Sequence, residues 1–185
     1  MPPQWRCDVV PFSPWYGVLP ALAAALLIGP MEEFGWRGVA LPLLQRRFTP
    51  LLASLLLGAA WGLWHLPAFL LSGTLQSAWS FGTYFVGVLA LSALVTPLFN
   101  ATRGSLLIPM LFHFQMNGPA WPDAQPWENY LFAAVAVAVV LLHRWAMLSR
   151  AGAVTYVLLP EDADHPDAAR GAATAPRGVA GQGGQ

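Results

Sequence analysis

Polar side chains that could do chemistry form three short groups inside otherwise apolar sequence: Glu32 and Glu33 with Arg37, then His65, then His113 with Asn117. A carboxylate can take a proton from water, and an imidazole or a carboxamide can hold a proton or donate to developing negative charge, which is the set that amide hydrolysis needs. Ionisable groups inside a membrane cost several kcal/mol each, so a set of them at one depth is most economically explained as a functional site.

The two glutamates differ in their positions on a helix. Glu33 and Arg37 are four residues apart with the acid first, so they can pair on one helical face. Glu32 is rotated by about 100° from Glu33, which leaves it without an obvious partner on its own helix. Taken alone, a pair such as Glu33 and Arg37 is more often a helix-stabilising ion pair than part of a functional site.

The remaining polar residues are predicted to lie at a matching depth. His113 and Asn117 are four apart and share a helical face, and Trp61 stands four before His65 and can cover its imidazole. At about 1.5 Å per residue, Glu32, His65 and the His113 pair lie roughly 12 to 21 Å from the helix ends on one side. A lone histidine inside a membrane more often hydrogen-bonds two helices together. The prediction of a site therefore rests on all of these polar residues lying at one depth.

Composition places these residues in a membrane. Of the 185 residues 56% are hydrophobic and 10% are charged, whereas a soluble domain carries about 25% charged residues. The nine basic and nine acidic residues balance, which argues against nucleic acid as a partner. The single cysteine, Cys7, allows neither an internal disulfide nor a multi-cysteine metal site.

The elements that must position the site are apolar helices. Apolar runs predict helices over 16–45, 51–71, 80–102, 105–118 and 128–149, hence an all-α polytopic transmembrane bundle of about five membrane helices. The run 105–118 is too short to cross the hydrocarbon, which takes about 20 residues. Pro30 beside Gly29 predicts a kink near the carboxylates, and Pro67 predicts a break beside His65.

Three regions and an orientation follow. Residues 1–15 form a leader, residues 16–150 the transmembrane core, and residues 151–185 a largely disordered tail rich in Ala, Gly and Pro. The arginines that join or close the helices fall on one side of the bundle: Arg46, Arg47, Arg103, Arg144 and Arg150. That side, with the tail, is expected to be cytoplasmic in a multi-pass protein of the cell membrane.

The motifs resemble those of a known family. Residues 32–38 read EEFGWRG, residues 61–65 read WGLWH, and residues 113–117 read HFQMN. They are similar to the EExxxR, FxxxH and HxxxN motifs of the CPBP family, also called Abi or CAAX-protease-like intramembrane proteases. The resemblance covers residues 25–120 and departs from the pattern at Trp61, where phenylalanine is usual.

The resemblance implies an intramembrane endopeptidase acting on a membrane-associated peptide or protein, such as a CAAX-type protein or a peptide precursor. It implies that Glu32 activates water, that His65 orients or polarises it, and that His113 and Asn117 donate to the oxyanion. The expected supporting residues are Glu33 and Arg37, which would hold the shape of the cavity, and Trp61. Members of the family carry helices before the first motif, so here the cavity is open, is completed by a second copy of the chain, or needs upstream helices.

Alternatives stay open at this point. A glutamate-activated water needs no cofactor, but Glu32, His65, His113 and Asn117 could instead bind Zn²⁺ or another divalent metal, although no HExxH helix is present. The same cavity could serve a catalytically silent membrane scaffold or a bacteriocin-immunity factor. A small transporter or proton relay would instead require polar residues spread across the bilayer.

Overall fold

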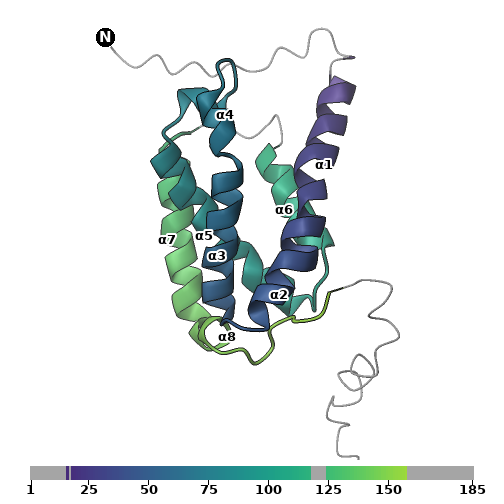
Figure 1. The fold of residues 1–185 in the computed structure, drawn as a ribbon, viewed down its shortest axis with the longest axis vertical. Coiled ribbons are helices and arrows are strands. Elements are labelled where there is room, and N and C mark those ends of the chain that lie inside the picture. Colours follow the sequence, from purple (N-terminus) through teal and green to yellow (C-terminus); the bar gives the residue numbers. More distant parts are fainter. Residues whose placement is uncertain (1–15, 17, 118–123, 158–185) are drawn as a thin grey trace, which may run out of the picture.

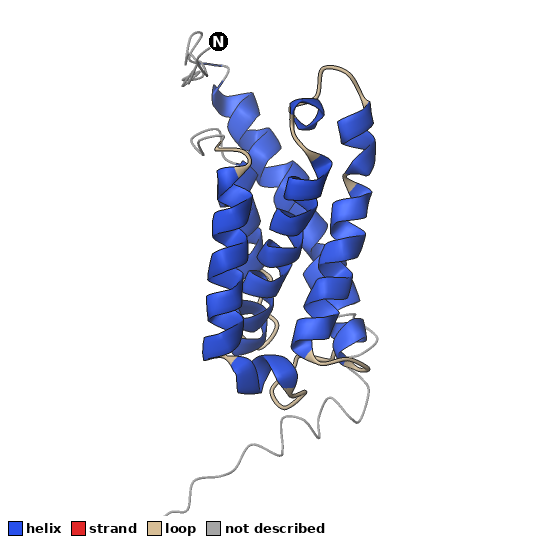
Figure 2. Cartoon of the chain, turned by 90° about the vertical axis from the view of Figure 1, so that its left-hand side faces the viewer, coloured by secondary structure: helices blue, strands red, loops and turns tan. Residues whose placement is uncertain are grey.

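The computed structural model describes residue 16 and residues 18–117 and 124–157, and these parts contain helices and loops and no strand (Figure 1, Figure 2). The helices are, in chain order, α1 (Val18–Gly35), the π-helix η2 (Trp36–Ala40), α2 (Leu41–Gln45), α3 (Pro50–Trp64), α4 (Leu66–Leu70), the 3₁₀-helix η3 (Gln76–Ala78), α5 (Phe81–Ala101), α6 (Leu107–Asn117), α7 (Trp127–Leu142) and α8 (Arg144–Leu148). The predicted all-α fold is confirmed, and each of the five predicted runs is helical. The predicted leader and the tail beyond residue 157 lie outside the described residues.

Polar side chains are buried and large apolar ones are exposed, the reverse of a water-soluble protein. Glu33 and Arg37 are each 1% exposed, whereas Leu70 is 77% and Leu142 79% exposed. In the described part, residues 50–70 and 81–101 are long and apolar enough to cross a membrane, and 127–142 is a shorter apolar helix. This distribution is that of an integral membrane protein whose surface meets lipid.

The first helical segment carries its irregular turn later than the sequence suggested. Helix α1 continues through Pro30, and the backbone departs from α-helical geometry only in η2, where the Leu41 N–H bonds the Trp36 carbonyl five residues back. Pro42 follows at the start of α2 and has no N–H to give to the preceding turn. A π-turn of this kind is common at functional sites, and here it directly follows the two glutamates.

The second segment breaks beside His65, as Pro67 predicted. Helix α3 begins with Pro50, after Thr49 has capped it by accepting a bond from the Leu52 N–H at 3.4 Å. It ends at Trp64, and α4 begins at Leu66 with Pro67 in its first turn. His65 therefore sits in the joint between two helices.

Small residues let the long helices approach closely. A Cβ added to Gly58 of α3 would lie 3.0 Å from the Cα of Leu89 on α5, and one added to Gly87 of α5 would collide with the Asn129 amide of α7. Such contacts hold helices together in lipid, where burial of apolar surface gives no net drive. Helices α3, α5 and α7 thus form one packed unit, with α1 and α6 packed against each other beside it (Figure 1).

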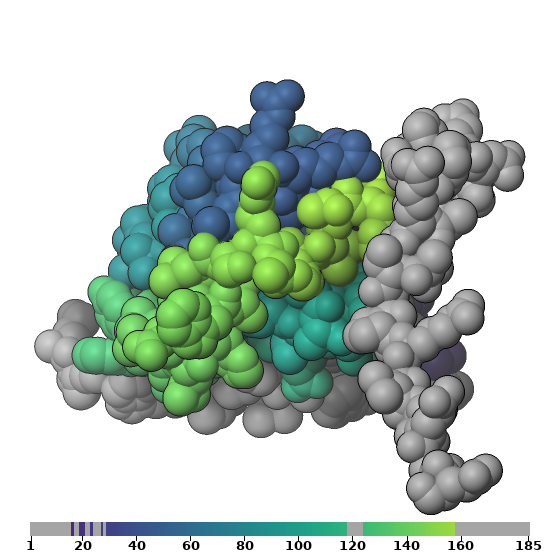
Figure 3. Space-filling model, turned by 90° about the horizontal axis from the view of Figure 1, so that it is seen from below, coloured from purple at the N-terminus to yellow at the C-terminus, as the bar shows by residue number. Residues whose placement is uncertain are grey.

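A strap crosses the end of the bundle at which α2 and α5 end. This C-terminal strap, residues 151–157, is fixed by Gln45, whose amide Nε2 donates to the Val154 carbonyl at 2.9 Å, and by Asn100, whose Oδ1 accepts from the Val154 N–H at 3.1 Å. Gln45 and Asn100 also bond each other reciprocally, at 3.1 and 2.7 Å. Seen from below, the yellow-green strap lies between blue and teal residues (Figure 3).

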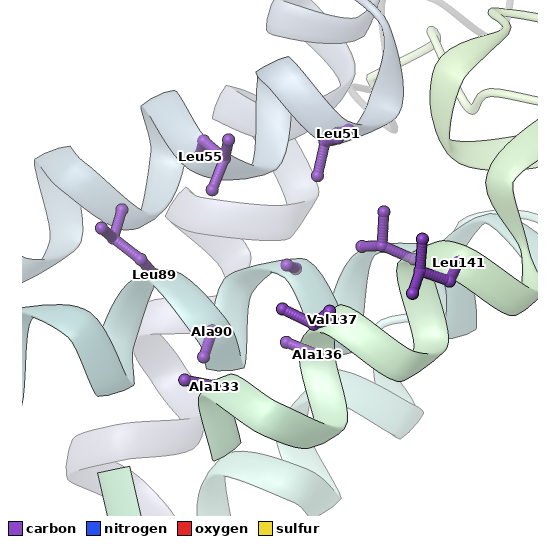
Figure 4. A pocket seen from close by; sticks show the side chains of 10 residues that line it. Leu51, Leu55, Leu89, Ala90, Ala133, Ala136, Val137 and Leu141 are labelled. Carbon is purple, nitrogen blue, oxygen red and sulfur yellow. The ribbon is translucent and has the colours of Figure 1, made fainter. Parts of the chain in front are cut away.

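An apolar groove of about 330 Å³ lies on the outside of α3, α5 and α7 (Figure 4). Leucine, alanine and valine side chains alone line it: Leu51, Leu55, Leu89, Ala90, Ala93, Ala133, Ala136, Val137, Val140 and Leu141. A groove without polar groups offers no means of bond cleavage, and none of the predicted site residues lines it.

Candidate active site

Trp61 is the point at which the predicted site residues meet. Its indole Nε1 donates to Glu32 Oε2 at 3.2 Å. Its ring makes edge-on contacts with both imidazoles, with centroids 6.1 Å from His65 and 5.2 Å from His113. The structure therefore brings α1, the α3–α4 joint and α6 together at one depth, around a side chain that is 7% exposed.

Glu32 has a partner on its own helix that the sequence reasoning missed. Trp36, four residues further on, donates its indole Nε1 to the same Oε2 atom at 3.2 Å. The expectation that Glu32 lacks a partner there is wrong because it considered charged partners only. An indole N–H is a donor without charge, and the i, i+4 spacing that pairs Glu33 with Arg37 equally pairs Glu32 with Trp36.

Glu33, Arg37 and His113 form a buried cluster. Glu33 Oε1 accepts from Arg37 Nη1 and from His113 Nδ1, each at 2.8 Å, and none of the three side chains is more than a tenth exposed. The Arg37 guanidinium also lies 4.8 Å from the centre of the Trp61 ring. The predicted Glu33 and Arg37 pair is present, and it additionally anchors the histidine of α6.

The hydrogen bonds fix which ring nitrogen of each histidine carries the proton. His65 Nδ1 lies 2.9 Å from the Trp61 carbonyl, and His113 Nδ1 faces the Glu33 carboxylate. Both partners only accept, so both Nδ1 atoms donate, and a neutral ring then carries its lone pair on Nε2. His65 Nε2 can therefore accept a proton from water, whereas His113 Nε2 can donate only when its ring is doubly protonated.

The side chains of His113 and Asn117 pack directly against Gly29 of α1. A Cβ added there would be 2.8 Å from His113 Cδ2 and 2.9 Å from its Nε2, and would collide with the Asn117 amide nitrogen. The two α6 residues thus share one face, as their spacing predicted. Among the described residues no direct hydrogen bond joins Glu32 to His65, His113 or Asn117, and Trp61 lies between them.

No three His, Cys, Asp or Glu side chains in the described ranges stand close enough together to hold a metal ion. Zinc commonly takes three or four protein ligands, and Glu33 is already bonded to Arg37 and His113. Metal binding by Glu32, His65, His113 and Asn117 stays a prediction.

Glu32 opens onto a groove between the first helical segment and α3. The groove has a volume of about 360 Å³ and is lined by Met31, Glu32, Gly35, Trp36, Ala40 and Trp64. Trp64 is 66% exposed at its edge. The Glu32 carboxylate is the charged group among lining residues that are otherwise apolar or aromatic.

Comparisons with known proteins agree with the resemblance. Residues 14–118, more than half of the chain and including every predicted site residue, match the model of Rce1-like type II CAAX prenyl endopeptidases. The chain is also 29% identical over 145 residues to CAAX prenyl protease 2 of Methanococcus maripaludis, an alignment that covers 72% of this chain and 54% of that protein. The chain thus spans about half the length of this curated relative. On the family match, the chain belongs to the Rce1-like family of type II CAAX prenyl endopeptidases.

Proposed function

We propose that this chain is an intramembrane endopeptidase that hydrolyses a peptide bond of a membrane-associated substrate, with Glu32 as the base that activates water. The observation that supports this most is the meeting of Glu32, His65 and His113 around Trp61. These are the residue types that amide hydrolysis requires, and they come from three separate segments of an apolar bundle.

The reaction follows from the groups present. The Glu32 carboxylate takes a proton from water while the water oxygen attacks the carbonyl carbon, and His65 Nε2 orients that water by accepting its second hydrogen. The Asn117 amide and the doubly protonated His113 ring donate to the oxyanion, with Glu33 opposite the histidine's charge. The tetrahedral intermediate then collapses, and Glu32 returns its proton to the leaving amine.

The groove supports a lipid-associated substrate. Its walls are apolar apart from Glu32, so the hydrocarbon chain of a lipid-modified substrate can lie in it without burying unpaired polar groups. The name of the Methanococcus maripaludis relative specifies a prenyl protease for CAAX sequences. We therefore propose a prenylated CAAX-type protein as the substrate.

We further propose that the strap end of the bundle faces the cytoplasm in the cell membrane. Arginines gather at this end: Arg46 Nε donates to the Thr155 carbonyl, Arg150 Nη1 donates to the Arg46 carbonyl, and the Arg103 carbonyl accepts from Tyr156. Basic residues favour the cytoplasmic side of a bilayer. A C-terminal tag should therefore be protected from external protease in intact cells. Rapid cleavage of the tag would show that this end of the bundle faces outward.

The test of the base is Glu32→Gln in liposomes, with an internally quenched peptide that ends in a prenylated CAAX sequence. Loss of a general base is expected to lower kcat by roughly 10²- to 10⁴-fold. Glu128→Gln, on α7 outside the site, is the matched control and should retain wild-type cleavage. Cleavage by Glu32→Gln at the wild-type rate would refute the assignment, and equal cleavage of prenylated and unprenylated peptides would refute the substrate class.

A further inference from the structure

We propose that the indole N–H groups of Trp36 and Trp61 form a clamp on one oxygen of Glu32 and so reserve its other oxygen for water. This indole clamp rests on the proposed role of Glu32 as the base. It makes Trp61, at the position where the family motif has phenylalanine, a positioning residue of this chain.

The geometry of the clamp is specific to one atom. Both indole nitrogens lie 3.2 Å from Glu32 Oε2, one from the same helical segment and one from α3. An indole carries a single polar hydrogen and no acceptor, so each contact is a donated hydrogen bond. No described residue donates to Oε1, and Glu32 lines the groove in which the substrate is proposed to lie.

Trp61 is held too firmly to turn away. The Arg37 guanidinium stands 4.8 Å from its ring centre and the His113 ring 5.2 Å from it. The terminal torsion of a free glutamate is broad, whereas two donors from different segments fix the plane of the carboxylate. Each indole hydrogen bond to the Glu32 carboxylate is also charge-assisted, which makes it stronger than a bond between neutral groups. The clamp therefore preorganises the base and ties its position to that of His113.

Trp61→Phe tests this role because phenylalanine keeps an aromatic ring between the histidines while it removes the N–H donor together with part of the indole's volume. If the clamp positions the base, kcat of Trp61→Phe should fall roughly tenfold at unchanged KM, since misplacing a base impairs the chemical step and leaves substrate binding intact. Trp36→Phe should lower kcat in the same way and serves as the second variant should Trp61→Phe fold poorly; because Trp36 also lines the groove, kcat and not KM is its readout. Trp145→Phe is the matched control and should keep the wild-type kcat, because the Trp145 side chain on α8 is exposed.

A second readout needs no substrate. In ¹H–¹⁵N spectra of the protein in detergent micelles, each tryptophan gives one indole N–H signal, and the two phenylalanine variants assign those of Trp36 and Trp61. Glu32→Gln should shift both signals, because the charged acceptor is lost, and should leave that of Trp145 in place.

The outcomes are distinct. Unmoved Trp36 and Trp61 signals in Glu32→Gln would overturn the clamp, and so would wild-type kcat in both Trp61→Phe and Trp36→Phe alongside an inactive Glu32→Gln. Shifted signals together with full cleavage by Glu32→Gln would overturn Glu32 as the base while leaving the hydrogen-bonded clamp standing. Shifted signals with the tenfold loss of kcat support both.

Discussion

Substitution of Gly29 by alanine tests whether the position of α6 governs the chemistry. The added methyl carbon would lie 2.8 Å from a His113 ring carbon, whereas ordinary contacts begin at about 3.4 Å, so the ring must retreat by about 0.6 Å. The Asn117 amide, which the methyl would meet even more closely, must move as well. Both proposed oxyanion donors are therefore displaced together by one methyl group that changes no charge.

The expected rise in the activation barrier is similar in size to the expected loss of stability, because each tenfold loss of rate corresponds to about 1.4 kcal/mol. Overpacking of this kind costs about 1 to 3 kcal/mol, and a misplacement of about 1 Å in a catalytic group can lower the rate about 10²-fold. We therefore expect Gly29→Ala to lower kcat by about 10- to 100-fold at similar KM and to remain folded.

The assay is cleavage of the prenylated peptide in liposomes, with the apparent Tm in detergent as the check on folding. Gly82→Ala, on α5, is the matched control: its Cβ would meet only Ser80 Oγ, at 3.9 Å. Wild-type kcat in a folded Gly29→Ala protein would show that His113 and Asn117 do not act from the place described.

Other substitutions test the packing around the site. Arg37→Met should lower the unfolding free energy by about 3 to 5 kcal/mol because it leaves the Glu33 carboxylate buried without its cation. Adding Glu33→Gln to this variant should restore part of the Tm. A double variant with no recovery of Tm would contradict the ion-pair explanation. Gln45→Leu should cost about 2 to 4 kcal/mol because it leaves the Val154 carbonyl and the Asn100 amide nitrogen without their partner. The measurement is a lower Tm together with faster proteolysis of the strap. Gly62→Ala would put a methyl 2.6 Å from the Phe85 ring and should lower the Tm by the equivalent of about 1 to 3 kcal/mol; an unchanged Tm would show that the ring gives way freely.

The sequence predicted those features that depend on local spacing. Apolar runs located all five helical segments, and the i, i+4 rule correctly paired Glu33 with Arg37 and put His113 and Asn117 on one face. The break beside His65 followed from Pro67, because a proline removes the same hydrogen bond in any helix.

Features that depend on contacts between distant segments were missed. His113 bonds Glu33 across 80 positions, and Trp61 reaches Glu32 across 29, separations that carry no periodic signal. The prediction places residues 151–157 in the tail together with the Ala-, Gly- and Pro-rich residues that follow, yet the strap is held largely through backbone groups such as the Val154 N–H and carbonyl. Hydrogen bonds of the main chain leave no mark on residue type, so composition could not reveal them.

The strap also sets an order of assembly. Because residues 151–157 leave the ribosome after every helix of the bundle, the buried Gln45 amide has to wait for the Val154 carbonyl until nearly all of the core has been made. A chain that stops short of Val154 would insert its helices with polar groups bared at that end, and unpaired groups of this kind invite proteolysis. Residues 151–157 thus close this end of the bundle, and a chain truncated before Val154 would lack that closure.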